Sequence, residues 1–297
     1  MNALRSAVTS GSSDLIVPGE FALRAGDFRR IASMIYDDAG IYLSESKATL
    51  VYARLAKRLR ALMLESFGEY CDLVASPQGR NERYEMLAAL TTNVTSFFRE
   101  GHHFEHLKQC VLPKLLDGAR KGGSVRFWSA ACSSGQEPYS IALTILPLMP
   151  DAASYDVKIL ATDIDPHIVA KAREGQYNSD ALENVPIEER RKYFSRASGS
   201  ESLWNISSEV KQLVAFKELN LTRDWPIKKQ FDGIFCRNVV IYFDEPTQQR
   251  IWSRFLPKLR PGGWLYIGHS ERVSGPAASE LRSDGITSYQ LKRGAEQ

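Results

Sequence analysis

The sequence predicts an α/β protein in which a small helical domain precedes a parallel β-sheet with helices on both faces. Three observations support this fold class. No strand pattern occurs before Ser124, whereas strands and helices alternate from Val125 onward, and such alternation is typical of parallel sheets. The first strand runs into a turn of small residues and then a helix, which is how open α/β sheets build ligand sites.

Composition and charge are those of an ordinary globular protein of up to two domains. The chain has 297 residues and a net charge of +3, which is too mild to indicate a nucleic-acid partner. Its 4 cysteines contain no C-x-x-C pair, so neither a disulfide framework nor a zinc site is predicted. No apolar run approaches the ~20 residues of a membrane span, and the N-terminus lacks the continuous apolar core of a signal peptide. We therefore expect a cytoplasmic protein.

The N-terminal region divides into a tail and a helical domain. Residues 1–20 are rich in Ser, Ala and Gly without any period, which predicts a mobile tail. Residues 21–90 predict a helical domain, because apolar residues recur at helical spacing from Phe28 onward. The second helix, from Ser44 to about Leu64, collects cations on one side. These are Lys47, Arg54, Lys57 and Arg58. They form either a solvated basic face or a docking surface for an acidic partner.

Residues 91–123 predict a linker and a helix. The linker begins with a hydroxyl-rich run that ends in two aromatic residues and Arg99, and by itself this run is compatible with a helix cap. His102 and His106 have a spacing that can suit a metal on a helix, but the H-E-x-x-H pattern is absent. We interpret them, with His103, as surface or hydrogen-bonded histidines and expect no metal.

Residues 124–297 predict the α/β domain. We expect strands at 125–131, 157–162, 214–219, 231–236 and 264–268, with an edge strand at 286–291. Helices are expected at 138–146, 166–174 and 247–259. Residues 177–210 are too long for a simple crossover, so we interpret them as an inserted subdomain built on a β-hairpin.

The predicted strand ends carry the residues that suit a ligand. The turn Ala131–Gly135 is followed by Glu137, and Asp163 ends the second strand. An acid at that position holds ribose hydroxyls in dinucleotide folds. The turn lacks the G-x-G-x-x-G pattern, and Glu137 would repel a pyrophosphate. The pattern therefore favours S-adenosylmethionine, which carries positive charge, over NAD.

Several longer motifs together resemble the CheR-type chemotaxis receptor methyltransferases, which are protein-glutamate O-methyltransferases. The resemblance extends over about residues 25–292. The motifs that carry it are Thr91–Glu100, Trp128–Ala131, Gly135–Ser140, Ala161–Asp165, Phe235–Phe243 and Gly268–Glu271.

The resemblance implies a helical N-terminal domain and a class I, Rossmann-like, S-adenosylmethionine-dependent methyltransferase domain with an inserted β-subdomain. It implies a catalytic role for Arg99 and Tyr242, which would lie near the transferred methyl group. Glu137 would meet the amino-acid end of the cofactor, and Asp163 would hold its ribose. Further cofactor contacts are implied for Asn93, Thr95, Arg99, Asn220, Leu221, Cys236, Arg237 and Asn238.

The implied reaction is methyl transfer to glutamate side chains on the cytoplasmic helices of chemoreceptors, with S-adenosylhomocysteine as the product. We expect a monomer that binds no nucleic acid and does not insert directly into the membrane. The inserted segment either binds a receptor's C-terminal peptide by strand addition or does not, since relatives differ in this respect. Two other classes stay open: a methyltransferase for RNA or a small molecule, and a non-catalytic module that binds the cofactor.

The sequence departs from the family's usual turn at two positions. Ser134 stands where the family has Thr, and Gln136 replaces the first of two acids. If that first acid contributes to the attraction of the sulfonium, its loss lowers the affinity for the cofactor modestly. If Glu137 alone makes the contact, nothing is lost.

Overall fold

The computed structural model describes residues 14–91 and 93–293. The chain forms two compact units, Met1–Thr92 and Asn93–Gln297, and each is described by itself. In neither stretch of described residues is a helix both long and apolar enough to cross a membrane.

Unit 1 is a small helical bundle preceded by a two-stranded antiparallel ribbon. Its elements are β1 (Leu15–Val17), β2 (Leu23–Arg24), α1 (Ala25–Ala39), η1 (Glu45–Lys47), α2 (Ala48–Leu62), α3 (Phe67–Ala75) and α4 (Arg80–Leu90). Gly40 ends α1 in a left-handed conformation, and the Ser66 side chain caps α3 by accepting a hydrogen bond from the Glu69 N–H.

The ribbon corrects the expectation that no strand precedes Ser124. Strands of two and three residues are too short to show the alternation by which strands are recognised. The predicted mobile tail falls mostly on residues 1–13, which lie outside the described residues, but its last part contains β1.

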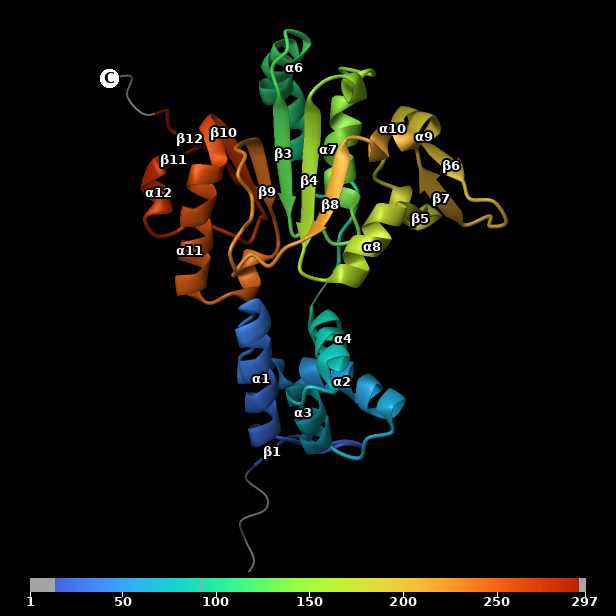
Figure 1. Ribbon diagram of the computed structural model, residues 1–297, viewed down its shortest axis with the longest axis vertical. Helices are drawn as coiled ribbons and strands as arrows, with labels where there is room; N and C mark the ends of the chain where they lie inside the picture. Colours follow the sequence, from blue (N-terminus) through green and yellow to red (C-terminus); the bar gives the residue numbers. More distant parts are fainter. Residues whose placement is uncertain (1–13, 92, 294–297) are drawn as a thin grey trace, which may run out of the picture. The chain divides into compact units, whose positions relative to one another are not determined.

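Unit 2 begins with a helical segment and continues into a seven-stranded sheet (Figure 1). The helical segment consists of α5 (His102–His106), a π-helical turn η2 (Leu107–Val111) and α6 (Leu112–Arg120). The strands of the sheet, in spatial order, are β11 (Leu281–Ser283), β12 (Ser288–Leu291), β10 (Leu259–Ile267), β9 (Phe231–Cys236), β3 (Val125–Ala130), β4 (Val157–Asp163) and β8 (Val214–Glu218).

The sheet is mixed rather than purely parallel, which corrects the prediction. Strand β12 pairs antiparallel with both β10 and β11, whereas β10, β9, β3, β4 and β8 are parallel. The edge strand on that side is β11, not the strand predicted at 286–291. Three residues of β11 give too little pattern to be recognised in the sequence.

Helices connect the parallel strands. They are α7 (Gln136–Ile145), α8 (Pro166–Glu174), α10 (Ser208–Lys211) and α11 (Glu245–Phe255), with short 3-10 turns η3 (Ala152–Ser154), η5 (Val240–Tyr242) and η6 (Leu256–Lys258). Helix α12 (Ala277–Glu280) lies between β10 and β11. Helix α7 is buried along its whole length because it packs on β3, β4 and β8. Asp165 caps α8 and Gly175 ends it, so this helix has the bounds that the sequence predicts.

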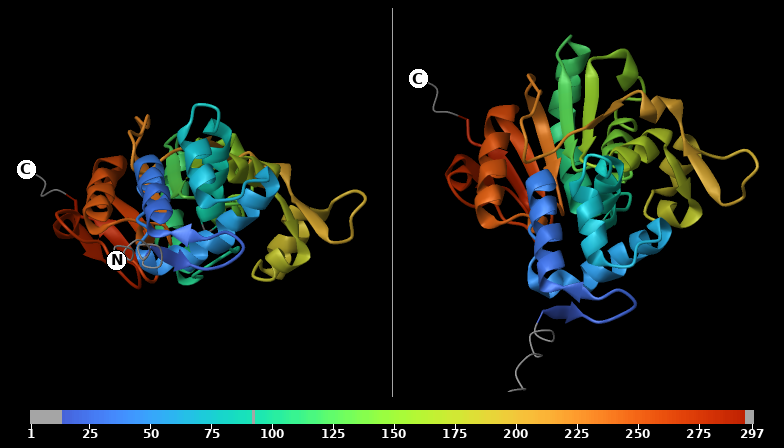
Figure 2. Two further views of the ribbon diagram at one scale, coloured as in Figure 1. Left: turned by 90° about the horizontal axis from the view of Figure 1, so that it is seen from below. Right: turned by 60° about the horizontal axis from the view of Figure 1, so that its bottom comes forward.

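The inserted segment forms a separate sheet. It contains β5 (Gln176–Asn178), η4 (Ser179–Leu182), α9 (Ile187–Tyr193), β6 (Phe194–Arg196) and β7 (Leu203–Ile206). The strands pair antiparallel in the order β5-β7-β6, so the module has one strand more than the predicted hairpin. Figures 1 and 2 show the insert projecting from the side of unit 2 that carries β8.

Candidate active site

The turn after β3 has a backbone that few side chains tolerate. Ala131, Ser133 and Gly135 all have positive φ, at 73°, 48° and 93°. A Cβ on Gly135 would lie 3.0 Å from the Cβ of Ala172 and from the hydroxyl of Tyr177. Non-glycine residues in the left-handed region are strained, and such residues cluster at ligand sites. The small residues are therefore required by the path of the chain.

Asp163, at the end of β4, lies beside this turn. Its carboxylate accepts hydrogen bonds from the Ser133 N–H (2.8 Å) and the Asp165 N–H (3.2 Å). Burial raises the pKa of Asp163, although these backbone donors oppose the shift. The side chain is thus a buried carboxylate that backbone donors hold in a fixed orientation.

Glu137, in the first turn of α7, is the second buried acid. Its Oε1 accepts a hydrogen bond from the Ser129 hydroxyl (2.7 Å), and its Oε2 pairs with Arg237 (3.1 Å). Burial raises the pKa of Glu137, and Arg237 is the main opposing influence. Although Glu137 and Asp163 follow different strands, both lie at the carboxyl edge of the sheet, where ligands of open α/β folds bind.

Arg237 connects Glu137 to the linker that precedes α5. Its guanidinium lies 3.4 Å from Glu100 Oε2 and donates a hydrogen bond to the main-chain oxygen of Arg99. The side chain is only 2% exposed, so one buried cation faces the buried carboxylate of Glu137 and the half-buried carboxylate of Glu100. Burial would raise the pKa of Glu100, but Arg237 and His269 outweigh it and hold this pKa at about 2.

Three further hydrogen bonds fix the linker: one to the turn after β3, one to α7 and one within the linker itself. The Ser133 hydroxyl donates to the Asn93 oxygen (3.0 Å), the Phe98 N–H donates to the Ser140 hydroxyl (2.9 Å), and Arg99 donates to the Val94 oxygen (2.9 Å). Phe98 and Glu100 have positive φ, at 51° and 57°. Two strained residues therefore flank Arg99, which is half-buried, as is Thr95.

The remaining predicted site residues follow β8 and β9. The Leu219 N–H donates to the Asp163 main-chain oxygen (2.9 Å), which brings the segment with Asn220 and Leu221 next to Asp163. Asn220 uses its side-chain oxygen to accept from Thr222, and Leu221 is buried.

Beyond β9 the predicted residues differ in exposure. Cys236 is fully buried, and burial raises the pKa of its thiol well above the usual range, so this thiol is inert and lines the site at most through its backbone. Tyr242 is half-buried in η5.

Two functional candidates were missed by sequence reasoning, although both belong to motifs quoted above. Glu100 ends the linker motif and contacts Arg237, Asn238 and His269. Glu271 ends the Gly268–Glu271 motif and accepts hydrogen bonds from backbone N–H groups after β9. In the sequence, each of the two is an acidic residue at the end of a motif. The predicted cofactor contacts gave neither acid a role, and this was the signal that could have identified them.

The two departures from the family's turn are bonded to each other. The Ser134 hydroxyl donates to Gln136 Oε1 at 2.7 Å, and both residues are buried. The Gln136 amide thus has a partner within the turn.

The histidines after the linker have protein partners. The buried His103 contacts Thr287 Oγ1 (2.9 Å), and His106 contacts the Tyr266 hydroxyl (3.0 Å). Glu100, His102 and His103 offer ligand atoms within 4.8 Å of one another. However, the Arg237 guanidinium lies 3.4 Å from Glu100 Oε2 and would repel a cation bound there. This cluster does not suit a metal.

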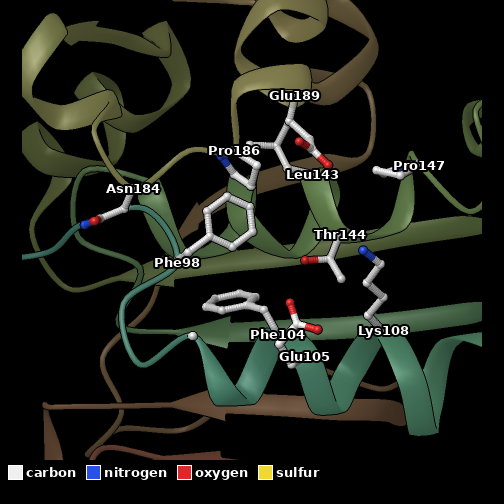
Figure 3. A pocket seen from close by; sticks show the side chains of 11 residues that line it. Phe98, Phe104, Glu105, Lys108, Leu143, Thr144, Pro147, Asn184, Pro186 and Glu189 are labelled. Atoms are coloured by element: carbon white, nitrogen blue, oxygen red, sulfur yellow. The ribbon is translucent and has the colours of Figure 1, made fainter.

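A cavity of about 210 Å³ lies away from the strand ends (Figure 3). It sits among the helices, between the segment 101–108 and α7, with the insert at its rim. Phe98 and Phe104 line it together with Gly101, Glu105, Lys108, Leu143, Thr144, Pro147, Asn184, Pro186 and Glu189. The two acids that would hold a ligand, Glu137 and Asp163, are not in its lining, so it is not the cofactor site.

In unit 1, the predicted basic face is only partly available. Arg54 donates to the main-chain oxygens of residues 89–91, and Arg58 pairs with Glu82 (2.6 Å). Lys47 and Lys57 are exposed. Two of the four cations thus stabilise the helical unit itself.

The residues at the strand ends fit a cationic cofactor. The turn after β3 admits a close ligand, and the buried Glu137 and Asp163 both have a raised pKa. Arg237 pairs with two carboxylates, Glu137 and Glu100, and the Asp163 carboxylate accepts from backbone N–H groups, so an added positive charge would offset the excess of negative charge.

Comparison with known proteins agrees with this chemistry. Residues 93–288 match the family description "CheR methyltransferase, SAM binding domain", and residues 26–91 match "CheR methyltransferase, all-alpha domain". A "Probable chemotaxis protein methyltransferase" of Rhizobium etli is 60% identical over 86% of this chain and 96% of its own length. The "Chemotaxis protein methyltransferase" of Escherichia coli is 42% identical over 91% of this chain and 93% of its own length.

Proposed function

This chain belongs to the CheR methyltransferase family, and on that premise we propose that it methylates glutamate side chains of chemoreceptors. The cofactor is S-adenosylmethionine, and the products are glutamate methyl esters and S-adenosylhomocysteine. The observation that carries the proposal is the chain of buried contacts from Glu137 through Arg237 to the main chain of Arg99. It connects the acid expected to meet the cofactor with the arginine expected to meet the substrate.

Each proposed cofactor contact uses a residue at the strand ends or in the linker. Asp163 would accept hydrogen bonds from the ribose hydroxyls, and Glu137 would attract the amino-acid end. Asn220 and Leu221 would flank the adenine, and the turn after β9 would close the site. The remaining contacts would come from Asn93, Thr95, Arg99, Cys236, Arg237 and Asn238.

The reaction needs positioning more than activation. When bound, the cofactor supplies a methyl group on a positively charged sulfur. The substrate glutamate has an ordinary pKa near ~4.3 and is already ionised at neutral pH, so no general base is required. Its negative charge is neutralised during transfer, and a cation clamped on the nucleophile would therefore slow the step. We assign to Arg99 and Tyr242 the orientation of the carboxylate for in-line attack.

The experiment is incubation with methyl-labelled S-adenosylmethionine and receptor-rich membranes. We expect a label on the receptor band that base releases, as for a glutamyl ester. Arg99→Ala and Tyr242→Phe should each lower kcat by at least about 100-fold, because positioning contributes at least this much. The exposed Arg282→Ala and Tyr84→Phe are matched controls and should keep full activity.

Three results would contradict the proposal. A base-stable label would exclude a glutamyl ester, and label in RNA would exclude a receptor substrate. Full activity of both site variants with cofactor bound would remove the assignment of Arg99 and Tyr242.

Docking to the receptor is the finer part of the proposal. The methylation regions of the chemoreceptors on which this family acts are acidic helices. The complementary positive charges of this chain are Lys47, Arg54, Lys57 and Arg58. Since Arg54 and Arg58 have partners inside unit 1, we assign the contact mainly to Lys47 and Lys57. The double variant Lys47→Glu/Lys57→Glu should raise KM for the receptor and weaken its dependence on salt, without changing kcat.

The control for docking is Lys121→Glu, an exposed residue before β3. It should leave KM unchanged. An unchanged KM and an unchanged salt dependence in the double variant would exclude this docking surface.

The insert offers a second receptor contact. Its sheet ends in the edge strand β6, to which an extended peptide could add as a fourth strand. Arg190 and Arg196 lie 5.0 and 5.1 Å from the ring of Trp204, next to that edge. Calorimetry with the receptor's C-terminal peptide tests this step, and an absence of heat at millimolar peptide would exclude it.

A further inference from the structure

The carboxylate of Glu271 is surrounded by backbone N–H groups from two turns. Oε2 accepts from Gly268 (2.7 Å) and Asn238 (2.9 Å). Oε1 accepts from Val239 (2.9 Å) and Val240 (2.8 Å), with Ile241 at 3.4 Å. One buried side chain therefore satisfies the donors of the whole segment that follows β9.

This segment needs an external acceptor because it cannot satisfy its own donors. It runs from Asn238, which has a φ of 58°, into the single 3-10 turn Val240–Tyr242. The first N–H groups of such a turn have no acceptor within it. Leaving them buried and unpaired would destabilise this conformation.

The segment fits closely against the turn that carries Glu271. A Cβ on Gly268 would lie 2.4 Å from Asn238 Nδ2 and 2.8 Å from its main-chain nitrogen. Val240 and Phe243 are buried, whereas Ile241 is exposed and Tyr242 is half-buried. Buried neighbours fix the turn on one side, and Glu271 fixes its main chain on the other.

We propose that Glu271 is a positioning residue: its carboxylate holds the turn 238–242 in the conformation that presents Tyr242 to the reacting carboxylate. This inference rests on the proposed function, in which Tyr242 orients the substrate. Glu271 acts through the backbone and touches neither substrate nor cofactor.

The carboxylate is required because both of its oxygens accept. Glutamine has the same shape, but its NH2 group can only donate. Whichever way the amide is turned, the NH2 group faces at least two backbone N–H groups. Glu271→Gln therefore keeps the side-chain volume but removes one of the two acceptor oxygens, so it tests the role of the carboxylate alone.

The experiment is a double-mutant cycle of Glu271→Gln and Tyr242→Phe in the full chain. Glu271→Gln should lower kcat about 10- to 100-fold, as expected for misplacement by about 1 Å. The Kd for S-adenosylhomocysteine, measured by calorimetry, should change much less. Tyr242→Phe combined with Glu271→Gln should be no slower than Tyr242→Phe alone, because the two residues act as one unit.

Hydrogen–deuterium exchange gives a readout that does not depend on the reaction. The amides of residues 238–241 should exchange faster in Glu271→Gln and keep their rates in Glu280→Gln, whose carboxylate is exposed. If Glu271→Gln does not fold, Glu271→Asp, which keeps the charge but is shorter, takes its place. We expect its kcat between those of the wild type and an inactive variant.

The outcomes separate the inference from the proposed function. Independent, multiplying losses in kcat would overturn the coupling between Glu271 and Tyr242, as would wild-type kcat and amide exchange in the folded Glu271 variant. A loss of kcat that follows entirely from lost cofactor binding would overturn it too. Wild-type kcat in Tyr242→Phe contradicts the proposed function itself.

Discussion

The two turns at the carboxyl edge of the sheet differ in how far the protein compensates the carboxylates beside them. The turn after β3 is bordered by Glu137 and Asp163, buried acids whose pKa is raised. The turn after β9 is bordered by Glu271, and both oxygens of its carboxylate accept hydrogen bonds from backbone N–H groups. The first leaves negative charge only partly compensated, and the second leaves its anchoring carboxylate fully bonded.

The difference indicates what each turn is for. A site for a cation has to keep carboxylates whose charge the protein itself does not fully balance. A turn that presents a side chain has to be rigid, and rigidity comes from satisfied donors and acceptors. Arg237 belongs to both, because it follows β9 in the sequence and yet pairs with Glu137.

The largest effect is expected from the substitution Arg237→Met, which removes the connection between the two turns. The variant keeps most of the side-chain volume but leaves the buried Glu137 without its cation and removes one of the two basic partners of the half-buried Glu100. Removing one partner of a buried ion pair destabilises a protein by about 3–5 kcal/mol. The free energy of unfolding in urea should fall by this amount at neutral pH.

A matched arginine shows whether burial is the cause. Arg282 also pairs with a carboxylate, Asp284, but both side chains are exposed, and exposed pairs contribute little. Arg282→Met should leave the unfolding midpoint unchanged within error. If both variants unfold at the wild-type urea concentration, Arg237 does not hold the two turns together.

The fold class and many element positions could be predicted from the sequence, because their signals are local. Helix α8 has the predicted bounds since Asp165, Pro166 and Gly175 mark its ends. Strand β9 was also predicted with its observed bounds, because the apolar residues Phe231 and Ile234–Cys236 mark both of its ends. The family and the S-adenosylmethionine-binding domain were recognised from motifs and are confirmed by comparison.

Contacts between distant residues could not be predicted in the same way. Arg237 lies 100 residues from Glu137 and 138 from Arg99 in the sequence, so no local pattern reveals their pairing. For the same reason the sequence does not reveal that Arg54, one of the cations of the predicted basic face, donates to the main-chain oxygens at the end of α4. Charge on a helix face indicates exposure only where no other element supplies a partner.

A smaller effect, on the affinity for the cofactor, is expected when pH is changed. It should distinguish the turn after β3 from the turn after β9. Glu137 and Asp163 must be ionised to attract a cationic ligand, but burial raises the pKa of both. As pH falls, they become protonated at a higher pH than ordinary carboxylates do, and the Kd for S-adenosylmethionine should rise. The change is limited to about tenfold per pH unit for each carboxylate that titrates.

Stability should respond with the opposite sign. An acid whose pKa is higher in the folded state binds protons more readily when folded, so protonation of Glu137 and Asp163 stabilises the fold as pH falls. Glu100, with a pKa of about 2, stays ionised until far lower pH, and its contribution to stability is lost only below the ordinary glutamate range.

Calorimetry at several pH values should therefore show weaker cofactor binding without earlier unfolding. Asp163→Asn should remove part of the pH dependence. An affinity that rises as pH falls would mean that the acids after β3 do not hold a cation.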